Sequence, residues 1–128
     1  MKKTIFALII FVILILACSC ASTATQDFPE WAGIFTGVIP AADCPGISVV
    51  AILKTNGTYK ITYQYIDRGD ELFTYTGIFT WDEKAKAITL DSSNIPSYKV
   101  KGNFLIHLDM EGKEIEGKLA DKYKLKRL

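Results

Sequence analysis

Apolar and polar residues alternate along short segments of the chain after residue 30. The clearest segment is 58–65, in which Tyr59, Ile61, Tyr63 and Tyr65 share one face and polar residues occupy the other. A period of two residues is the pattern of a β-strand that buries one of its faces. This segment therefore predicts a strand that contributes aromatic side chains to a core.

Similar segments recur at intervals of roughly ten residues, separated by turns rich in glycine, asparagine, aspartate and proline. Asn56-Gly57 is a strong hairpin signal because both residues tolerate positive φ. Gly77 lies in the middle of a predicted strand and indicates a bend or a bulge. No amphipathic helix is predicted after the N-terminal segment. The further predicted strands are 33–39, 48–54, 72–81, 87–90, 98–101, 103–109, 113–119 and 122–128.

About eight or nine strands with hairpin-length connections predict an antiparallel up-and-down meander. A meander of this size usually closes into a small barrel, because closure removes the unpaired edges of the sheet. We therefore predict an all-β fold, a small antiparallel up-and-down β-barrel over residues 31–128, with an interior filled by aromatic side chains. A two-sheet sandwich is the alternative architecture.

The N-terminus has the pattern of a secretory signal peptide. Lys2 and Lys3 precede an apolar run over residues 5–16, which ends in small residues. The run is shorter than the roughly 20 apolar residues of a membrane span. We expect residues 1–17 to be removed, with a retained signal anchor as the alternative. Residues 18–30 are then a tether to the barrel.

The cysteines that follow the apolar run predict a lipid anchor. Ile15-Leu16-Ala17-Cys18 resembles a bacterial lipobox, in which the cysteine receives a diacylglycerol. We expect Cys18 to be lipidated; Cys20 fits the pattern less well and is the alternative, and no lipidation is the third possibility. Each buried methylene of an acyl chain contributes about 0.8 kcal/mol to membrane binding. An aspartate directly after the lipidated cysteine often retains enterobacterial lipoproteins in the inner membrane. Ser19 occupies this position here, so we expect an outer-membrane location.

The charge balance argues against a nucleic-acid partner. The chain has 15 Lys and Arg against 14 Asp and Glu, and without Lys2 and Lys3 the balance becomes 13 against 14. Domains that bind nucleic acid carry a clear basic excess. The locally basic segment 118–127 is explained more simply as the solvent face of a strand.

The sequence offers no recognisable catalytic arrangement. It has a single histidine, His107, and lacks a Ser-His-Asp spacing, a phosphate-binding loop and a zinc-binding pattern. The string Arg68-Gly69-Asp70 is interpreted as a polar turn, not as a recognition motif. We conclude that the chain is not an enzyme. A group of carboxylates suits an exposed hairpin: Asp109, Glu111, Glu114 and Glu116.

The most specific motif is the segment 37–47, which reads Gly-Val-Ile-Pro-Ala-Ala-Asp-Cys-Pro-Gly-Ile. It resembles the motif Pro-Cys-Ala-Asp-Cys-x-Gly-Ile of the NlpE-like copper-resistance lipoproteins. Ala41 stands where the family has the first cysteine of a C-x-x-C pair. Less specific similarity extends the resemblance over most of residues 31–126. The matching positions are Pro40, Ala42, Asp43, Cys44, Gly46 and Ile47.

The resemblance implies a lipocalin-like barrel on an outer-membrane lipoprotein associated with copper resistance and envelope stress. Longer members carry a second domain with its own cysteine pair, which we do not expect here because the sequence ends at Leu128. The implied role is a binding or sensing module that engages another envelope protein. The alternative is a lipocalin-like carrier of a small apolar ligand, which a barrel packed by Tyr63, Phe79 and Trp81 would exclude.

Two thiolates at C-x-x-C spacing suit copper(I), whereas one thiolate does not. Cys44 lacks its partner, Cys20 could supply one only if the tether folded back, and Asp43 is a hard oxygen ligand. His107 and Met110 are soft or borderline ligands, but we expect His107 to lie on the solvent face of its strand. We therefore expect no cofactor and a structural role for the loop, with Cys44 as the remaining copper candidate.

Overall fold

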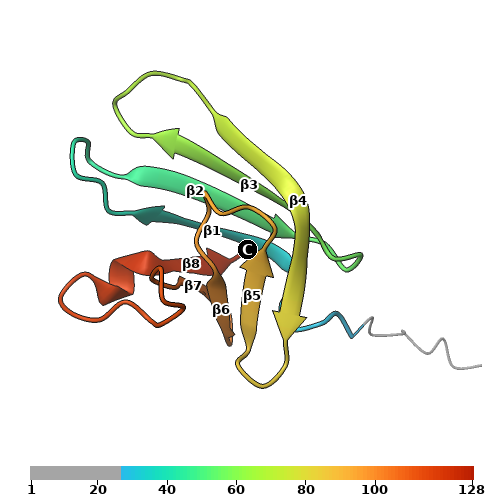
Figure 1. Cartoon of the computed structure of the whole chain (residues 1–128). Helices are drawn as coiled ribbons and strands as arrows, with labels where there is room; N and C mark the ends of the chain where they lie inside the picture. The colour runs from blue at the N-terminus through green and yellow to red at the C-terminus, as the bar shows by residue number, and fades with distance from the viewer. Residues whose placement is uncertain (1–26) are drawn as a thin grey trace, which may run out of the picture.

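The computed structural model describes residues 27–128, which form eight antiparallel strands and one short 3₁₀-helix (Figure 1). Each strand pairs with the next along the chain, and β8 pairs with β1, so the sheet is a closed barrel. This topology confirms the predicted all-β up-and-down barrel, and the sandwich alternative is wrong. The elements are β1 (Gly33–Ile39), β2 (Ile47–Leu53), β3 (Thr58–Tyr65), β4 (Phe73–Asp82), β5 (Ala87–Leu90), β6 (Tyr98–Lys101), β7 (Phe104–His107), η1 (Ala120–Tyr123) and β8 (Lys124–Arg127).

The strand predicted at 113–119 is wrong. The segment between β7 and β8 instead forms a turn of its own, closed by an isolated bridge between Leu108 and Glu114. Both β7 and β8 are already paired on each side within the barrel, so the alternating segment has no free strand edge to join. The segment lies on the outside of the barrel instead, where the Glu114 carboxylate pairs with Lys99 at 2.8 Å.

Inward-facing residues of the strands form one continuous hydrophobic core. Fully burying the side chain of a valine, leucine, isoleucine or phenylalanine contributes about 1.5–3 kcal/mol relative to leaving it exposed. The packed interior is therefore the main source of the stability of the barrel. The largest fully buried side chains are Tyr98, Phe35, Leu53, Ile61, Ile88, Leu105, Leu125 and Val49.

One end of the barrel, here called the closed end, is covered by the residues that precede β1. The Trp31 ring packs edge-on against Phe79, with ring centroids 5.1 Å apart. The Arg127 guanidinium donates hydrogen bonds to the backbone carbonyls of Glu30 and Ala32. These contacts fix the lead-in segment onto the barrel.

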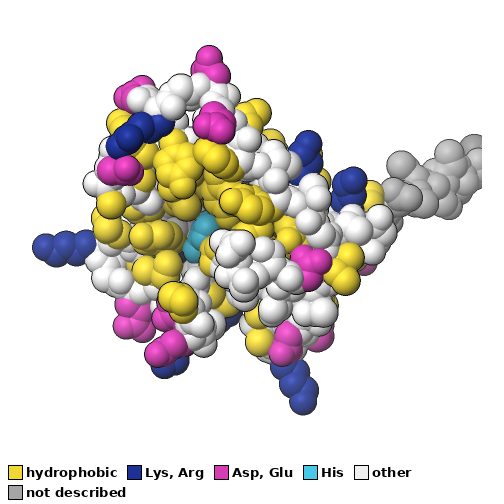
Figure 2. Space-filling view, turned by 45° about the horizontal axis from the view of Figure 1, so that its top comes forward, with side chains coloured by type: hydrophobic (Ala, Val, Ile, Leu, Met, Phe, Trp, Pro, Cys, Tyr) yellow, Lys and Arg dark blue, Asp and Glu magenta, His cyan; other side chains and the backbone are white. Residues whose placement is uncertain are grey.

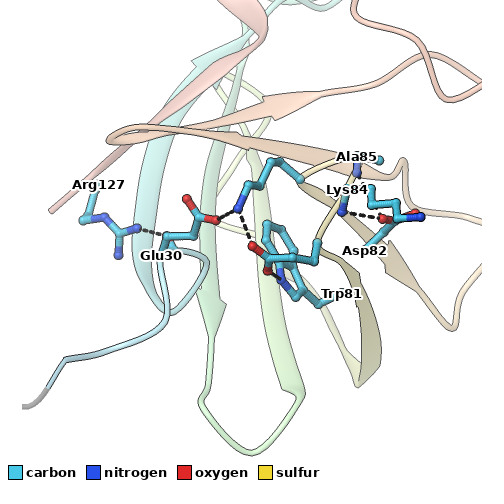
Figure 3. Close-up of polar contacts among 8 residues, drawn as sticks. Glu30, Trp81, Asp82, Lys84, Ala85 and Arg127 are labelled. Atoms are coloured by element: carbon cyan, nitrogen blue, oxygen red, sulfur yellow. Dashed lines mark hydrogen bonds and ion pairs between the residues drawn. The ribbon is translucent and has the colours of Figure 1, made fainter.

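Exposed ion pairs add to this cover (Figure 3). The Lys86 ammonium contacts the carboxylates of Glu30 at 2.5 Å and Glu83 at 2.6 Å. The Trp81 indole N–H donates to Glu83 at 2.7 Å. Because the pairs are open to water, they orient the lead-in segment more than they stabilise it.

Residues 1–26 lie outside the described part of the chain. The predicted signal peptide (1–17), the lipid anchor at Cys18 and its alternative at Cys20 therefore stay predictions. In residues 27–128, no helix is long and apolar enough to cross a membrane.

Candidate functional site at the open end of the barrel

The end of the barrel opposite the closed end is here called the mouth. Because β1 runs from the closed end to the mouth and each following strand reverses direction, four connections meet there. They are the loops 40–46, 66–72, 91–97 and 108–123. The mouth therefore faces away from the point where the N-terminal lead-in enters the barrel (Figure 1).

A hollow of about 360 Å³ opens at the mouth. Figure 2 shows this face, on which hydrophobic side chains surround the opening and the single histidine is visible near its centre. The volume is near the lower limit of the roughly 300–1,000 Å³ that small-molecule pockets occupy. The lining residues are mostly apolar: Ile39, Ile47, Tyr63, Tyr65, Phe73, Tyr75, Asn94, Pro96 and His107.

Aromatic side chains become progressively more exposed toward the mouth. On the inward face of β3, Ile61 is fully buried, Tyr63 is half-buried and Tyr65 is 38% exposed. On β4, Tyr75 and Phe73 are exposed to a similar degree. The rings pair edge to face across the two strands, with centroids 5.9 Å apart for Tyr63 and Tyr75 and 5.6 Å for Tyr65 and Phe73. These aromatic pairs form one wall of the hollow.

Tyr63 and His107 form the floor of the hollow, and the fully buried Tyr98 packs against both of them. The hydroxyls of Tyr63 and Tyr98 are hydrogen-bonded at 3.2 Å. Burial raises the pKa of Tyr98 well above its ordinary value, so its phenol stays neutral. The His107 ring packs edge-on against Tyr98, with centroids 4.7 Å apart. Because the core is packed beneath this floor, the hollow is a shallow cup.

The expectation that His107 lies in solvent is wrong: its side chain is 3% exposed. His107 does lie opposite Ile106 and Leu108, but it belongs to the inward face with Leu105, while the segment after β7 covers the outward face. All four residues 105–108 are consequently buried. Burial lowers the pKa of His107 to about 4, so the imidazole is neutral at physiological pH.

The two neighbours of β4 pair with different halves of this long strand. Its pairing with β3 ends at Ile78, and its pairing with β5 begins at Phe79. The Asp91 carboxylate accepts hydrogen bonds from the Ile78 N–H at 3.2 Å and the Tyr59 hydroxyl at 2.9 Å. Gly77 lies next to this junction, at the position where a bend was predicted. Asp91 thus connects β3 and β4 at the point where their pairing ends.

The loop 40–46, which carries the cysteine motif, packs tightly against the mouth. The Cys44 thiol is half-buried and donates to the Gly46 carbonyl at 3.2 Å. The same carbonyl accepts a hydrogen bond from the Ile66 N–H at 3.0 Å. A Cβ at Gly46 would lie 2.6 Å from Cγ1 of Val38. These contacts support the structural role predicted for the loop.

Asp43 and Arg68 connect two loops of the mouth. The Arg68 guanidinium donates to the Asp43 carboxylate at 2.9 Å and to the Asp43 backbone carbonyl at 2.7 Å. Arg68 opens the Arg-Gly-Asp string, and this contact gives it a local structural partner. The interpretation of the string as a polar turn is consistent with this arrangement.

The other candidate ligands are not assembled into a metal site. Within the described residues, no group of three or more His, Cys, Asp and Glu side chains could hold a metal ion. Met110 is fully exposed. Sequence reasoning missed Tyr98, which packs against Tyr63 and His107 of the cup, and Asp91, which hydrogen-bonds to β3 and β4. Their signals are weak, because one begins a short strand and the other directly follows one.

Comparison with known proteins identifies the family. The profile described as the NlpE N-terminal domain matches residues 35–118. The chain belongs to this family. It is also 37% identical over 82 residues to lipoprotein NlpE of Escherichia coli K12, an alignment that covers 62% of this chain and 35% of that protein. The chain therefore spans about a third of the length of this curated relative.

Two crystal structures share the NlpE-like fold. A candidate lipoprotein of Shewanella oneidensis is 34% identical, with a TM-score of 0.69, and the match covers 79% of this chain and 95% of that one. The Cpx pathway activator NlpE of Escherichia coli is 31% identical, with a TM-score of 0.57, over 67% of this chain and 46% of that one. The predicted family resemblance is confirmed.

Restoring the missing cysteine provides a test of the copper expectation. We expect the Ala41→Cys variant to bind copper(I) at least about 100-fold more tightly than the unaltered chain, since even an outer-shell change costs about 10–100-fold. Competition with bicinchoninate measures this, with Cys18 and Cys20 replaced by serine in both proteins. Removal of copper from the chelator by Cys44 alone would contradict the expectation.

Proposed function

We propose that this chain is an outer-membrane lipoprotein whose barrel serves as a non-catalytic binding or sensing module in envelope-stress signalling. The observation that carries the proposal is the family match over residues 35–118, in a family that includes the Cpx pathway activator of Escherichia coli. Family membership is the basis for assigning a related role to this shorter chain.

The arrangement of the two ends of the barrel supports this proposal. The lead-in segment enters at the closed end, where Arg127 and Lys86 hold Glu30. With a lipid anchor at Cys18, the closed end would lie nearest the membrane. The mouth and the loop 40–46 would then face away from the membrane, toward a partner in the envelope.

The proposal includes no catalytic or copper-dependent step. His107 is buried, and none of the described side chains hydrogen-bonds to its Nε2 atom. The Cys44 thiol is engaged with the Gly46 carbonyl. The burial of His107 and the contact made by the Cys44 thiol therefore favour binding over catalysis or copper chemistry as the activity of the barrel.

The packed interior argues against a carrier that encloses its ligand. Phe79 is buried, and Tyr63 and Trp81 pack against the core. A barrel packed by these three side chains is the arrangement that we expect to leave no room for an enclosed apolar ligand. Any ligand would have to occupy the shallow cup at the mouth.

A reporter of the Cpx pathway in Escherichia coli lacking its own NlpE tests the proposal. We expect production of the full chain to raise reporter output several-fold, because the related barrel domain would engage the same pathway. A variant with Cys18 and Cys20 both replaced by serine should lose localisation to the outer membrane. An unresponsive reporter, at envelope levels that match a responsive control carrying Escherichia coli NlpE, would refute the signalling role.

A further inference from the structure

The cup at the mouth presents an unusual amount of aromatic surface to solvent. Tyr65, Phe73 and Tyr75 are 38%, 38% and 37% exposed, and all three line the same hollow. Exposed apolar side chains that gather in one concave patch mark binding sites more often than isolated ones do. The aromatic rings offer flat apolar faces to a ligand at small cost in conformational entropy.

The floor of the cup contains a polar group that the protein leaves unsatisfied. The His107 side chain is 97% buried, and its Nε2 atom has no hydrogen-bond partner within residues 27–128. A buried polar atom without a partner costs about 1–3 kcal/mol. The Nε2 atom is sealed from solvent, so the His107 ring contributes aromatic surface to the floor and no hydrogen bond to a ligand in the cup.

The size of the cup limits the ligand to a small molecule. The hollow measures about 360 Å³, and the Tyr63–Tyr98 hydroxyl pair closes it from below. A ligand would therefore bury its apolar part against the aromatic wall and keep its remainder near the rim. A long chain could not enter the core, which is packed beneath the floor.

The charges beside the cup select against an anion. An adjoining hollow is lined by Asp43, Arg68 and Glu71 together with Tyr65 and Phe73 of the cup. Asp43 and Arg68 neutralise each other at 2.9 Å. Glu71 has no ion-pair partner in the described part of the chain, so this side of the rim is net negative. Aromatic faces attract cations as well.

We propose that the mouth is a binding site for one small apolar molecule, uncharged or cationic, which packs against the aromatic side chains of the cup. The aromatic wall holds the apolar part of the ligand, and the carboxylate of Glu71 disfavours anions. This site goes beyond the proposed signalling role, which requires no ligand.

Two fluorescent probes that differ by one charge test the proposal. N-phenyl-1-naphthylamine is neutral and carries one N–H group, and 8-anilino-1-naphthalenesulfonate adds a sulfonate to nearly the same rings. We expect saturable one-site binding of the neutral probe by the full chain, and binding of the anionic probe at least about tenfold weaker. Glu71→Gln should reduce the difference in affinity between the two probes, because it removes the negative charge from the rim. Equal affinity for both probes, or binding of the neutral probe that never saturates, would overturn the proposal.

Phe73 and Phe104 provide a matched pair of variants. Both are phenylalanines of similar exposure, at 38% and 40%, but Phe104 is not part of the cup. We expect Phe73→Ser to lower the affinity for the neutral probe at least about tenfold, as truncation of an aromatic anchor does. Phe104→Ser should leave this affinity unchanged. Equal losses in the two serine variants would overturn the site.

The state of association distinguishes a ligand site from a contact between copies of the chain. We expect sedimentation of the full chain to show no dimer whose formation depends on Phe73. A dimer that is lost in the Phe73→Ser variant would make a second copy the occupant of the mouth and would overturn the proposal. The reporter assay of the signalling role is independent of this result.

Discussion

Acidification from about pH 7.5 to about pH 4.5 is expected to lower the free energy of unfolding by about 2.5 kcal/mol through His107 alone. In the folded barrel, burial lowers the pKa of this imidazole to about 4. In the unfolded chain, the pKa is about 6.5. Between these values, the unfolded chain binds a proton that the folded barrel does not. The stabilisation is therefore complete above about pH 6.5 and declines as the pH falls toward 4.

Urea unfolding at both pH values measures this effect, with His107→Leu as the control. His107 is the single histidine of the chain, and the variant should lose most of the pH dependence in this window. Lys99 and Lys124 lower the pKa of Glu114 and Asp121, respectively. Those carboxylates lose stabilisation only below about pH 4.5, near their unfolded values. A slope that persists in His107→Leu would contradict the assignment.

The error over His107 shows what alternation along a strand can determine. Alternation places His107 opposite Ile106, and the structure agrees. It does not determine which face is wet, because β7 is buried on both faces. The outward face is covered by a segment that the sequence pattern presents as another strand. The barrel itself was predictable because most strands bury one face and their turns are marked by local residue types.

Long-range side-chain contacts between loops and strands could not be predicted from local pattern. Asp43 and Arg68 are 25 positions apart, and Asp91 reaches Tyr59 across 32 positions. Such pairs depend on how the strands are placed in space, and a single sequence contains no periodic signal for them. Gly77 could be singled out from its position within a predicted strand, but its neighbour Asp91 could not.

Gly77→Ala is expected to lower the free energy of unfolding by about 2–3 kcal/mol, because it displaces a carboxylate that holds the barrel wall together. A Cβ at this position would lie 2.2 Å from Oδ1 of Asp91 and 2.8 Å from its Oδ2. Asp91 would have to move, and its hydrogen bonds to the Tyr59 hydroxyl and the Ile78 N–H would be lost. Burial of Tyr59 and its hydrogen bond to Asp91 also raise the pKa of the Tyr59 hydroxyl to about 12.

A double-mutant cycle with Asp91→Ala separates this clash from a general effect of replacing glycine in a strand. Asp91→Ala alone should be destabilising because it removes the same hydrogen bonds, but it also makes room for the Cβ. In the Asp91→Ala background, Gly77→Ala should therefore cost at least about 1.5 kcal/mol less than in the unaltered chain. Chemical denaturation of the four proteins measures the coupling. Additive effects would mean that Gly77 is required for the conformation of the backbone, and not for its contact with Asp91.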